Sequence, residues 1–374
     1  MTYIKNPFKY GAPVEGEYYF PLPGFRKLVR SYLDNRINVV LYGPRRFGKT
    51  SFILDLAKEE EKEKKTFILI DVYNVTSHLD FLQQVLRGLR PKQTWVQKLK
   101  DKVFKARLVP SAVLDPMGQM TYSLSPDFSS AKDVKELIQD TFSAFSKLDE
   151  SVIVVIDEFQ KIFQLDDSGW LQHTVRTQMQ ELKNCVFLFS GSKKSVLSDM
   201  LNDPNNPFYK SCEILDMPIL GDDFTGWVIE RFKKINIQCE KKAIVELRKL
   251  VHDTPNYIQQ TCFHIATQAI KKLIDSYQVK QALHTIVKQN AYTFETIHNS
   301  LTLLQQRALR LCANEDKAIF SREFINRYQI PNAPTLAQSI KALKRRGILD
   351  PTPKPGQVNF EDPLFKIWIQ IELS

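Results

Sequence analysis

Residues 37–50 read INVVLYGPRRFGKT and decide the fold. The β-branched run 37–42 predicts a buried strand. Gly43 to Thr50 then fit the pattern G-x-x-x-x-G-K-[ST], and a helix is predicted to follow through Lys62. Glycines let the backbone amides of such a loop wrap an anion, and the start of the helix adds a positive dipole. The stretch therefore predicts a phosphate-binding loop.

The residues of this loop have separate expected roles. Lys49 is expected to reach the β- and γ-phosphates of a nucleoside triphosphate, with ATP as the favoured ligand, and the Thr50 hydroxyl to bind Mg²⁺. For Arg45 and Arg46, contact with phosphate and pairing with an acid elsewhere both remain open. The predicted nucleotide-binding residues are Gly43, Pro44, Arg45, Arg46, Phe47, Gly48, Lys49, Thr50 and Ser51.

A second motif, IVVIDEF, occupies residues 153–159. A parallel strand buried on both faces is nearly all apolar, as this run is. Its end places Asp157 at the carboxyl edge of the sheet, where ligands of α/β proteins bind. Asp157 is predicted to hold Mg²⁺, and Glu158 to polarise the attacking water. A carboxylate in that position favours hydrolysis over phosphoryl transfer to a metabolite.

Three further polar residues are candidates for the same chemistry. The strand FLFSGS (187–192) ends in Ser190 and Ser192, either of which is predicted to sense the γ-phosphate or the water; an ordinary strand-end turn is the alternative. Arg176, in the preceding helix, fits an arginine finger offered to a neighbouring subunit and fits a solvated helix residue equally well.

Composition limits the class of protein. A chain of 374 residues is expected to form two or three domains. The sequence has no apolar run long enough for a transmembrane helix, no secretory signal, and 5 cysteines spread singly, so we expect a cytoplasmic protein without disulfides or zinc. A net charge of +10 is compatible with a nucleic-acid partner, and equally with an ordinary soluble protein.

The pattern of elements predicts an α/β fold with three domains. Strands alternate with helices in residues 1–221, which predicts a parallel-sheet core, with a β-hairpin insertion near 106–125. Residues 222–300 are predicted to be a helical lid. Residues 301–374 are predicted to form three helices and a β-wing, the order of a winged helix-turn-helix.

The third helix of this winged unit has one apolar and one basic face. The basic face has Lys341, Lys344 and Arg345, and the apolar face has Leu336, Ile340 and Leu343, so the helix could enter a DNA major groove. The unit has eleven Lys and Arg against seven Asp and Glu, which is only mildly basic. Binding to double-stranded DNA and binding to a protein partner therefore both remain open.

With these motifs in hand, the chain resembles the archaeal-type ATPases, a branch of the AAA+/STAND group of P-loop NTPases. The resemblance spans nearly the whole chain. It rests on NPFKYGAPVEGEYYF at the start, GPRRFGKTS, IDVYNVTS, VIVVIDEFQ, FLFSGSKKSVLSDM with NPFYK, TPNYIQQ in the lid, and FEDPLFKIWI near the end.

This resemblance implies that the P-loop residues and Ser51 bind nucleotide, that Asp157 binds the metal, and that Glu158 is the catalytic base. Ser190 or Ser192 would be the first sensor, and the segment from Phe20 to Phe25 would lie near the adenine.

Three positions depart from the family pattern. Thr254 stands where the lid usually has a glycine before its proline. Asn256 stands where related lids place a sensor arginine, and Lys210 where an arginine is common.

The sequence thus predicts an AAA+/STAND-like ATPase that binds Mg-ATP, hydrolyses it slowly, and uses the difference between ATP and ADP as a conformational switch. A DNA-binding regulator and a scaffold that holds nucleotide without hydrolysis are the alternatives. The sequence leaves the oligomeric state open.

Overall fold

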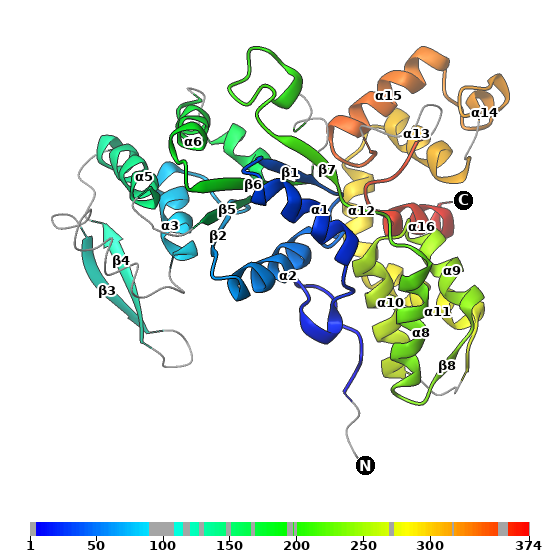
Figure 1. Cartoon of the computed structure of the whole chain (residues 1–374). Coiled ribbons are helices and arrows are strands. Elements are labelled where there is room, and N and C mark those ends of the chain that lie inside the picture. The colour runs from blue at the N-terminus through cyan, green and yellow to red at the C-terminus, as the bar shows by residue number, and fades with distance from the viewer. Residues whose placement is uncertain are drawn as a thin grey trace. The chain divides into compact units, whose positions relative to one another are not determined.

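The computed structural model describes residues 5–89, 108–114, 120–126, 131–146, 151–165, 169–192, 197, 200–268, 273–315, 318–350 and 358–373 (Figure 1). The chain forms two compact units. We call residues 22–43 and 52–217 the sheet unit, and residues 1–21, 44–51 and 218–374 the helical unit. The short loop 44–51 belongs to the helical unit although it follows a strand of the sheet.

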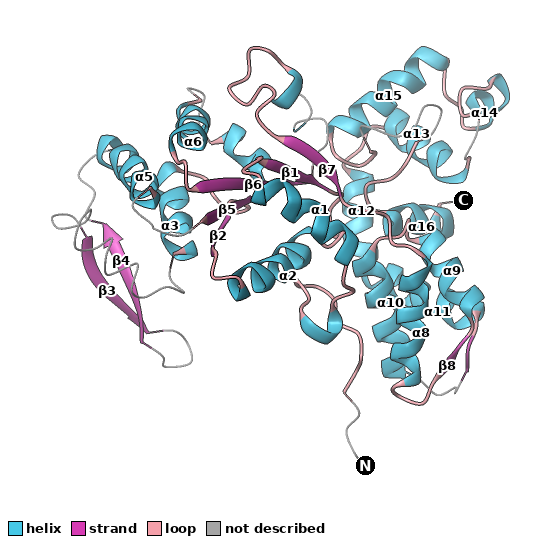
Figure 2. Cartoon of the chain, in the orientation of Figure 1, coloured by secondary structure: helices cyan, strands magenta, loops and turns pink. Residues whose placement is uncertain are grey.

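The sheet unit is built on a parallel sheet of five strands in the order β2-β5-β6-β1-β7 (Figure 2). These strands are β1 (Val39–Tyr42), β2 (Thr66–Asp71), β5 (Val152–Asp157), β6 (Cys185–Gly191) and β7 (Glu213–Asp216). Every residue of β5 and β6 is buried, because helices cover both faces of a parallel sheet. The predicted parallel α/β core is confirmed.

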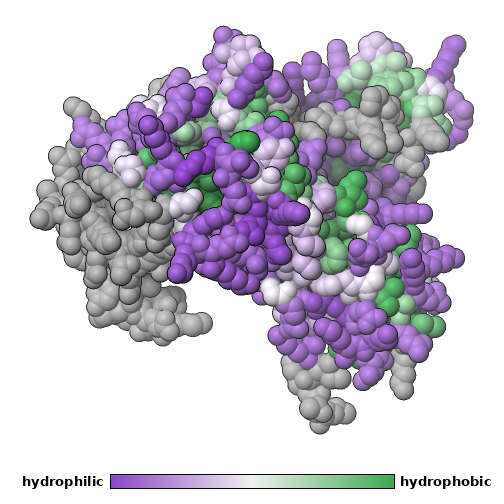
Figure 3. Space-filling model, in the orientation of Figure 1, coloured by the Kyte–Doolittle hydropathy of each residue, from purple (hydrophilic) through white to green (hydrophobic). Residues whose placement is uncertain are grey.

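The helices of this unit pack on the sheet through apolar stripes. They are α1 (Pro23–Asp34), α2 (Lys49–Lys62), which begins in the loop, α3 (His78–Gly88), α5 (Ala131–Phe145), the 3-10 helix η2 (Phe159–Gln164) and α6 (Trp170–Glu181). Helix α1 packs on β1 and β6, and α3 on β2. The exposed side of α2 is strongly hydrophilic (Figure 3), since its last turns carry Lys58, Glu61 and Lys62, all exposed.

An aromatic cluster anchors the end of the central strands. The ring centroids of Phe159 and Phe189 lie 4.1 Å apart, and Phe208 meets Phe159 edge-on at 5.1 Å. All three side chains are fully buried, and burial of each contributes about 2–3 kcal/mol. The chain just after β5 is therefore held rigidly.

The helical unit contains the remaining elements. They are the 3-10 helix η1 (Gly16–Tyr18), α8 (Asp222–Lys233), α9 (Lys241–Leu250), α10 (Pro255–Gln268), α11 (Ser276–Gln289), α12 (Ala291–Asn299), α13 (Leu303–Asn314), α14 (Arg322–Arg327), α15 (Ala333–Arg345) and α16 (Pro363–Glu372), with the strands β8 (Gln238–Cys239) and β9 (Leu273–Ile274). In this unit α8 packs on α9, and α13 on α15 and α16.

Side-chain caps fix where several of these helices begin. Thr302 forms a capping box with Gln305 at α13, Ser321 caps α14, and Asn332 caps α15. The predicted three helices are confirmed, although α13 begins at Leu303 rather than Leu301. Leu349 pairs antiparallel with Phe360, but residues 351–357 of the predicted wing lie outside the described part of the chain.

Four features differ from the sequence-based expectation or go beyond it. Strand β7 was not predicted, because only one of its four residues is buried. The pair β8–β9 adds a two-residue parallel ladder to a region predicted to be helical only. Helix α16 forms in a segment for which the sequence predicted no secondary structure. The sequence predicts a helix over residues 79–105; helix α3 ends at Gly88, and residues 90–105 lie outside the described part of the chain.

The predicted hairpin insertion corresponds to β3 (Leu108–Leu114) and β4 (Met120–Pro126), which pair antiparallel. Its predicted turn at 115–118 lies outside the described residues. No helix within the described ranges is long and apolar enough to cross a bilayer.

Candidate nucleotide site

The predicted phosphate loop runs from the end of β1 into the first turn of α2. Gly43 anchors its start, since the Gly43 amide donates to the Gly191 carbonyl at the end of β6 (3.3 Å). Gly48 has φ +93°, a backbone conformation that favours glycine, and a Cβ there would meet open space. The loop is thus shaped by backbone freedom and remains open beside Gly48.

Lys49 lies at the start of α2 and is only 5% exposed. Its Nζ donates to the Pro44 carbonyl at 3.1 Å, so the ammonium group is folded back over the loop it belongs to. Thr50 is half-buried, and the Ser51 hydroxyl accepts from the Val14 amide at 2.9 Å. Lys49 therefore adds a cation to the start of α2, and a helix start with a cation beside it favours a bound anion such as phosphate.

The sheet order explains how the other predicted groups come together. Strand β6 lies between β5 and β1, so its carboxyl end separates the acids that end β5 from the start of the loop. Ser190 donates to Asp157 Oδ1 at 2.5 Å, and the Glu158 amide donates to the same oxygen at 2.9 Å. Asp157 and Ser190 are both buried. One oxygen of the predicted metal ligand is thereby fixed by two donors.

Glu158 directly follows β5 in a left-handed backbone conformation, with φ +57°. For a residue other than glycine this geometry costs about 1 kcal/mol, and such strain concentrates at functional sites. Its Oε2 accepts from the Ser192 hydroxyl at 3.1 Å and from the Gln160 amide. The structure brings Asp157, Glu158, Ser190 and Ser192 together, as the sequence predicts, and adds Gln160.

Asp71 is a third acid at this edge that sequence reasoning missed. It ends β2 directly opposite Asp157, the last residue of β5. Burial raises the pKa of Asp71, and the nearby charges of Asp157 and Glu158 raise it further, whereas a hydrogen bond from the Tyr73 amide opposes the shift. The sequence does indicate this acid, because the apolar run TFILID (66–71) ends in an aspartate just as IVVID (153–157) does.

The chemistry of these groups suits Mg²⁺ only in part. Carboxylate and hydroxyl oxygens are among its preferred ligands; Asp157 offers a carboxylate in the sheet unit, and Thr50 offers a hydroxyl in the helical unit. Within the described residues, no cluster of three or more acidic, His or Cys side chains could hold a metal without help. The carboxylate of Asp157 fits Mg²⁺ as one ligand among other oxygens, such as those of water and phosphate.

Within the helical unit, Arg46 of the loop contacts α10 and the start of α16. Its backbone has φ +64°, its guanidinium donates to the Tyr257 hydroxyl in α10, and its Cζ lies 4.9 Å from the centre of that ring. Nη1 also lies 3.5 Å from Asp362 Oδ2. The sequence left contact with phosphate and pairing with an acid open for Arg46, and in the structure Arg46 pairs with the acid Asp362. Arg45 is exposed.

Asp362 has two contacts that the sequence does not reveal. Its Oδ1 accepts from the Leu364 amide at 2.9 Å and so caps α16, while Oδ2 faces Arg46. Burial raises the pKa of Asp362, and Arg46 opposes that shift. Tyr257 and Asp362 both lie in segments that carry the family resemblance, but no local pattern points to a contact with residue 46.

The N-terminal segment of the helical unit packs against α10 and α8. The Gly11 amide donates to Asn256 Oδ1 at 3.1 Å, at the position where related lids carry an arginine. The ring of Phe20 packs on Phe224 and Trp227 in α8. Phe25 belongs to the sheet unit and packs on Phe52. A position of these aromatic rings near adenine stays a prediction.

The Arg176 side chain is hydrogen-bonded within the sheet unit. Its Nε donates to the Pro207 carbonyl at 2.9 Å, and the side chain is half-buried. A finger role would require this contact to break, and it stays a prediction.

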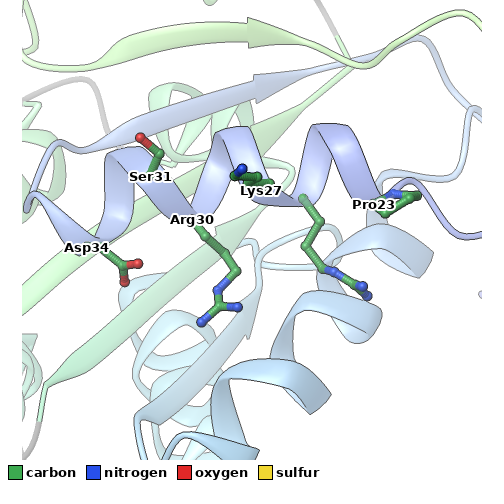
Figure 4. A pocket seen from close by; sticks show the side chains of 6 residues that line it. Pro23, Lys27, Arg30, Ser31 and Asp34 are labelled. Atoms are coloured by element: carbon green, nitrogen blue, oxygen red, sulfur yellow. The ribbon is translucent and has the colours of Figure 1, made fainter.

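A separate hollow of about 440 Å³ runs along α1 (Figure 4). Its lining includes Arg26 and Arg30, each of which already faces a carboxylate. Arg26 pairs with Asp55 at 2.8 Å, and Arg30 Nε lies 2.7 Å from Glu60, whose side chain is fully buried. The hollow is best explained by ion pairs that join α1 to α2.

On the winged unit, α15 buries Leu336, Ile340 and Leu343. Lys341 and Arg345 are exposed, and Lys344 is half-buried. The predicted division into an apolar and a basic face is therefore confirmed. Binding of DNA by the basic face stays a prediction.

Family models match two parts of the chain. The model of an ATPase domain found predominantly in Archaea matches residues 27–261, and that of a winged helix domain matches residues 292–371. No curated protein matches the sequence of this chain.

Solved structures share the fold at low identity. The Walker-type ATPase of Pyrococcus abyssi superposes with a TM-score of 0.65 at 18% identity, over 95% of this chain and 97% of its own. The ORC2 protein of Aeropyrum pernix gives a TM-score of 0.53 at 13% identity, over 94% of this chain and 93% of its own.

The ATPase-domain model covers residues 27–261, more than half of the chain, and the chain belongs to the family of ATPase domains found predominantly in Archaea.

Proposed function

We propose that this protein binds Mg-ATP and hydrolyses it to ADP and phosphate. The observation that supports this most is the order of the strands. Asp157 and Glu158 end β5, Ser190 and Ser192 lie at the end of β6, and β6 is the neighbour of β1, from which the phosphate loop begins. A metal ligand, a base and two hydroxyls thus share the sheet edge from which the loop departs.

Each residue has a role in this proposal. The amides of residues 43–51 cradle the phosphates, Lys49 neutralises the β- and γ-phosphates, and Thr50 and Asp157 hold the ion, which supplies charge neutralisation when bound. Glu158 accepts a proton from the attacking water. Ser190 orients Asp157, and Ser192 orients Glu158.

The choice of an adenine nucleotide rests on the family and on one neighbour. The family is named for its ATPase domain, and the Aeropyrum pernix ORC2 structure is described as holding ADPNP and ADP. Both support adenine over other bases in this chain.

The contacts of Arg46 support a conformational switch. Within the helical unit, its guanidinium donates to the Tyr257 hydroxyl and faces the Asp362 carboxylate. Arg46 also belongs to the loop that would surround the phosphates. A phosphate group is a stronger partner for arginine than a half-exposed carboxylate. Binding of ATP would thus draw Arg46 from Asp362, and loss of phosphate would return it.

Substitution of Glu158 by Gln tests hydrolysis. We expect phosphate release to fall at least about a hundredfold, because the amide cannot accept the proton, while the Kd for ATP stays within about twofold. The matched control is Glu213→Gln. Glu213 is exposed and begins β7, whereas Glu158 follows the end of β5, so phosphate release by this variant should equal that of wild type. Wild-type phosphate release at background level, unchanged by Glu158→Gln, would support a scaffold that only holds nucleotide; equal release above background would show that Glu158 is not the base.

Duplex DNA binding through α15 is the second candidate, and the exposed basic residues Lys341 and Arg345 favour it. Affinity for a DNA duplex should then fall steeply with salt. Replacing Lys344 and Arg345 by Gln should make the slope of log affinity against log salt concentration shallower. Each of the two side chains that binds a phosphate should account for about one unit of that slope. Binding that is absent or insensitive to salt would remove this candidate.

A further inference from the structure

The side chain of Gln160 is buried among the acids of the proposed site. It is 3% exposed, and it follows Phe159, whose ring is clamped by Phe189 and Phe208. A glutamine seldom occupies such an interior position unless its amide is hydrogen-bonded. The surroundings of Gln160 therefore need a specific reason.

The hydrogen bonds of Gln160 converge on Glu158. Its Nε2 donates to Glu158 Oε2, and it also lies 3.4 Å from Ser192 Oγ. Ser192 in turn donates to the same Glu158 oxygen at 3.1 Å. Because a carboxylate only accepts, the amide must present its NH₂ group to Glu158, which fixes the orientation of the amide.

The structure makes room for this orientation at Gly191. A Cβ on Gly191 would lie 2.5 Å from Gln160 Oε1 and 2.8 Å from Leu197 Cδ1. The φ angle of Gly191 lies outside the left-handed region, so backbone freedom does not require glycine there. Gly191 also accepts from the Gly43 amide, and so joins the amide pocket to the start of the phosphate loop.

A purely structural role does not explain Gln160 well. Its Oε1 is buried and has no hydrogen-bond partner within the described part of the chain, which destabilises the fold. An apolar side chain of the same length would avoid that penalty. The penalty is explained if the NH₂ group is needed for the carboxylate beside it.

We propose that Gln160 is a positioning residue for ATP hydrolysis: with Ser192 it fixes Glu158 through Oε2, so that Oε1 is left to accept the proton of the attacking water. The inference rests on the proposed ATPase function. A base held in one rotamer by two donors reacts from a narrower range of geometries, and small displacements of such groups lower turnover strongly.

Gln160→Met tests this, since Met has a similar shape and no donor. We expect kcat for phosphate release to fall about tenfold, with the Kd for ATP within about twofold and the melting temperature equal to or above that of wild type. The matched control is Gln178→Met. Gln178 is a buried glutamine of α6 whose Oε1 also lacks a partner within the described residues and whose Nε2 faces Glu181, so its kcat should not change.

A double-mutant cycle shows whether Gln160 acts through Glu158. In a Glu158→Gln background, Gln160→Met should have no further effect on the single-turnover rate. A second variant, Gly191→Ala, should lower kcat as well, because its Cβ displaces the Gln160 amide. If Gln160→Met lowers the rate by the same factor in both backgrounds, Gln160 does not act through Glu158 and the inference is wrong.

The remaining outcomes separate this inference from the function on which it rests. Hydrolysis by wild type that Gln160→Met leaves unchanged would overturn the role of Gln160 alone. Wild-type phosphate release no faster than that of Lys49→Ala would overturn both.

Discussion

Asp71, Asp157 and Glu158 concentrate negative charge at the ends of β2 and β5. Burial and the two neighbouring acids raise the pKa of Asp71, so its ionised form is disfavoured in the folded protein. The group therefore destabilises the fold above its folded pKa, and the effect disappears as the pH falls through that value. A cation bound between these acids and a nucleotide would relieve the same repulsion.

We therefore expect Asp71→Asn to stabilise the nucleotide-free protein at pH 7, by less than about 1 kcal/mol because Asp71 is partly exposed. The gain in melting temperature should shrink on acidification. Asp140→Asn, an exposed position on α5, is the control and should leave the melting temperature unchanged. A melting temperature that falls at pH 7 would show that the charge of Asp71 is not in conflict with its neighbours.

Residues whose chemistry is local were predictable from the sequence. Lys49, Asp157 and Glu158 follow from the two motifs, because strand, loop and helix fix their position within a few residues. Tyr257 and Asp362 were not predictable, since their relation to Arg46 joins positions far apart in the chain. Gln160 lies directly after the second motif, but only the fold shows that its amide faces Glu158.

Among the elements, α16 begins at a residue with two functions. Asp362 caps the helix through Oδ1 and faces Arg46 through Oδ2. Asn is as good an N-cap as Asp, but it has no charge to offer arginine. The two contacts can therefore be separated by substitution.

Asp362→Ala should loosen the first turn of α16 by about 1 kcal/mol, because the Leu364 amide loses its acceptor. Hydrogen exchange at the first turn should then be about fivefold faster than in wild type, whereas Asp362→Asn should exchange much as wild type does. Equal exchange in the Ala and Asn variants would mean that the cap does not limit the opening of this helix.

The strands of the sheet differ in how far the sequence alone predicts them. The strands β1, β5 and β6 were predicted because each is a continuous apolar run. Strand β7 was not predicted, because it lies at the edge of the sheet and most of its side chains are exposed. Only its pairing with β1 defines it as a strand. The parallel fold was therefore predictable from its buried strands, while its edge and the order of its strands were not.

At the scale of the whole molecule, the proposed switch depends on competition for Arg46. Asp362→Asn removes the competitor and should tighten the binding of a non-hydrolysable ATP analogue, up to about fivefold for a partly exposed ion pair. In an Arg46→Gln background the same substitution should have no effect. Equal changes in both backgrounds, measured by calorimetric titration, would contradict the competition.

Oligomer formation belongs to the same scale. If Arg176 acts as a finger, the solution mass should increase with the ATP analogue relative to ADP, and Arg176→Ala should lower kcat only under conditions in which the oligomer forms. A monomer with either nucleotide would leave Arg176 as a residue that holds the loop at Pro207.

The central claim is that residues 43–51 bind the phosphates of ATP. Titration calorimetry of wild type and Lys49→Ala with Mg-ATP tests it most directly, with the exposed Lys62→Ala as the control. The account predicts saturable one-site binding by wild type and Lys62→Ala, and affinity at least about a hundredfold weaker for Lys49→Ala. Binding by Lys49→Ala as tight as that of wild type would contradict it.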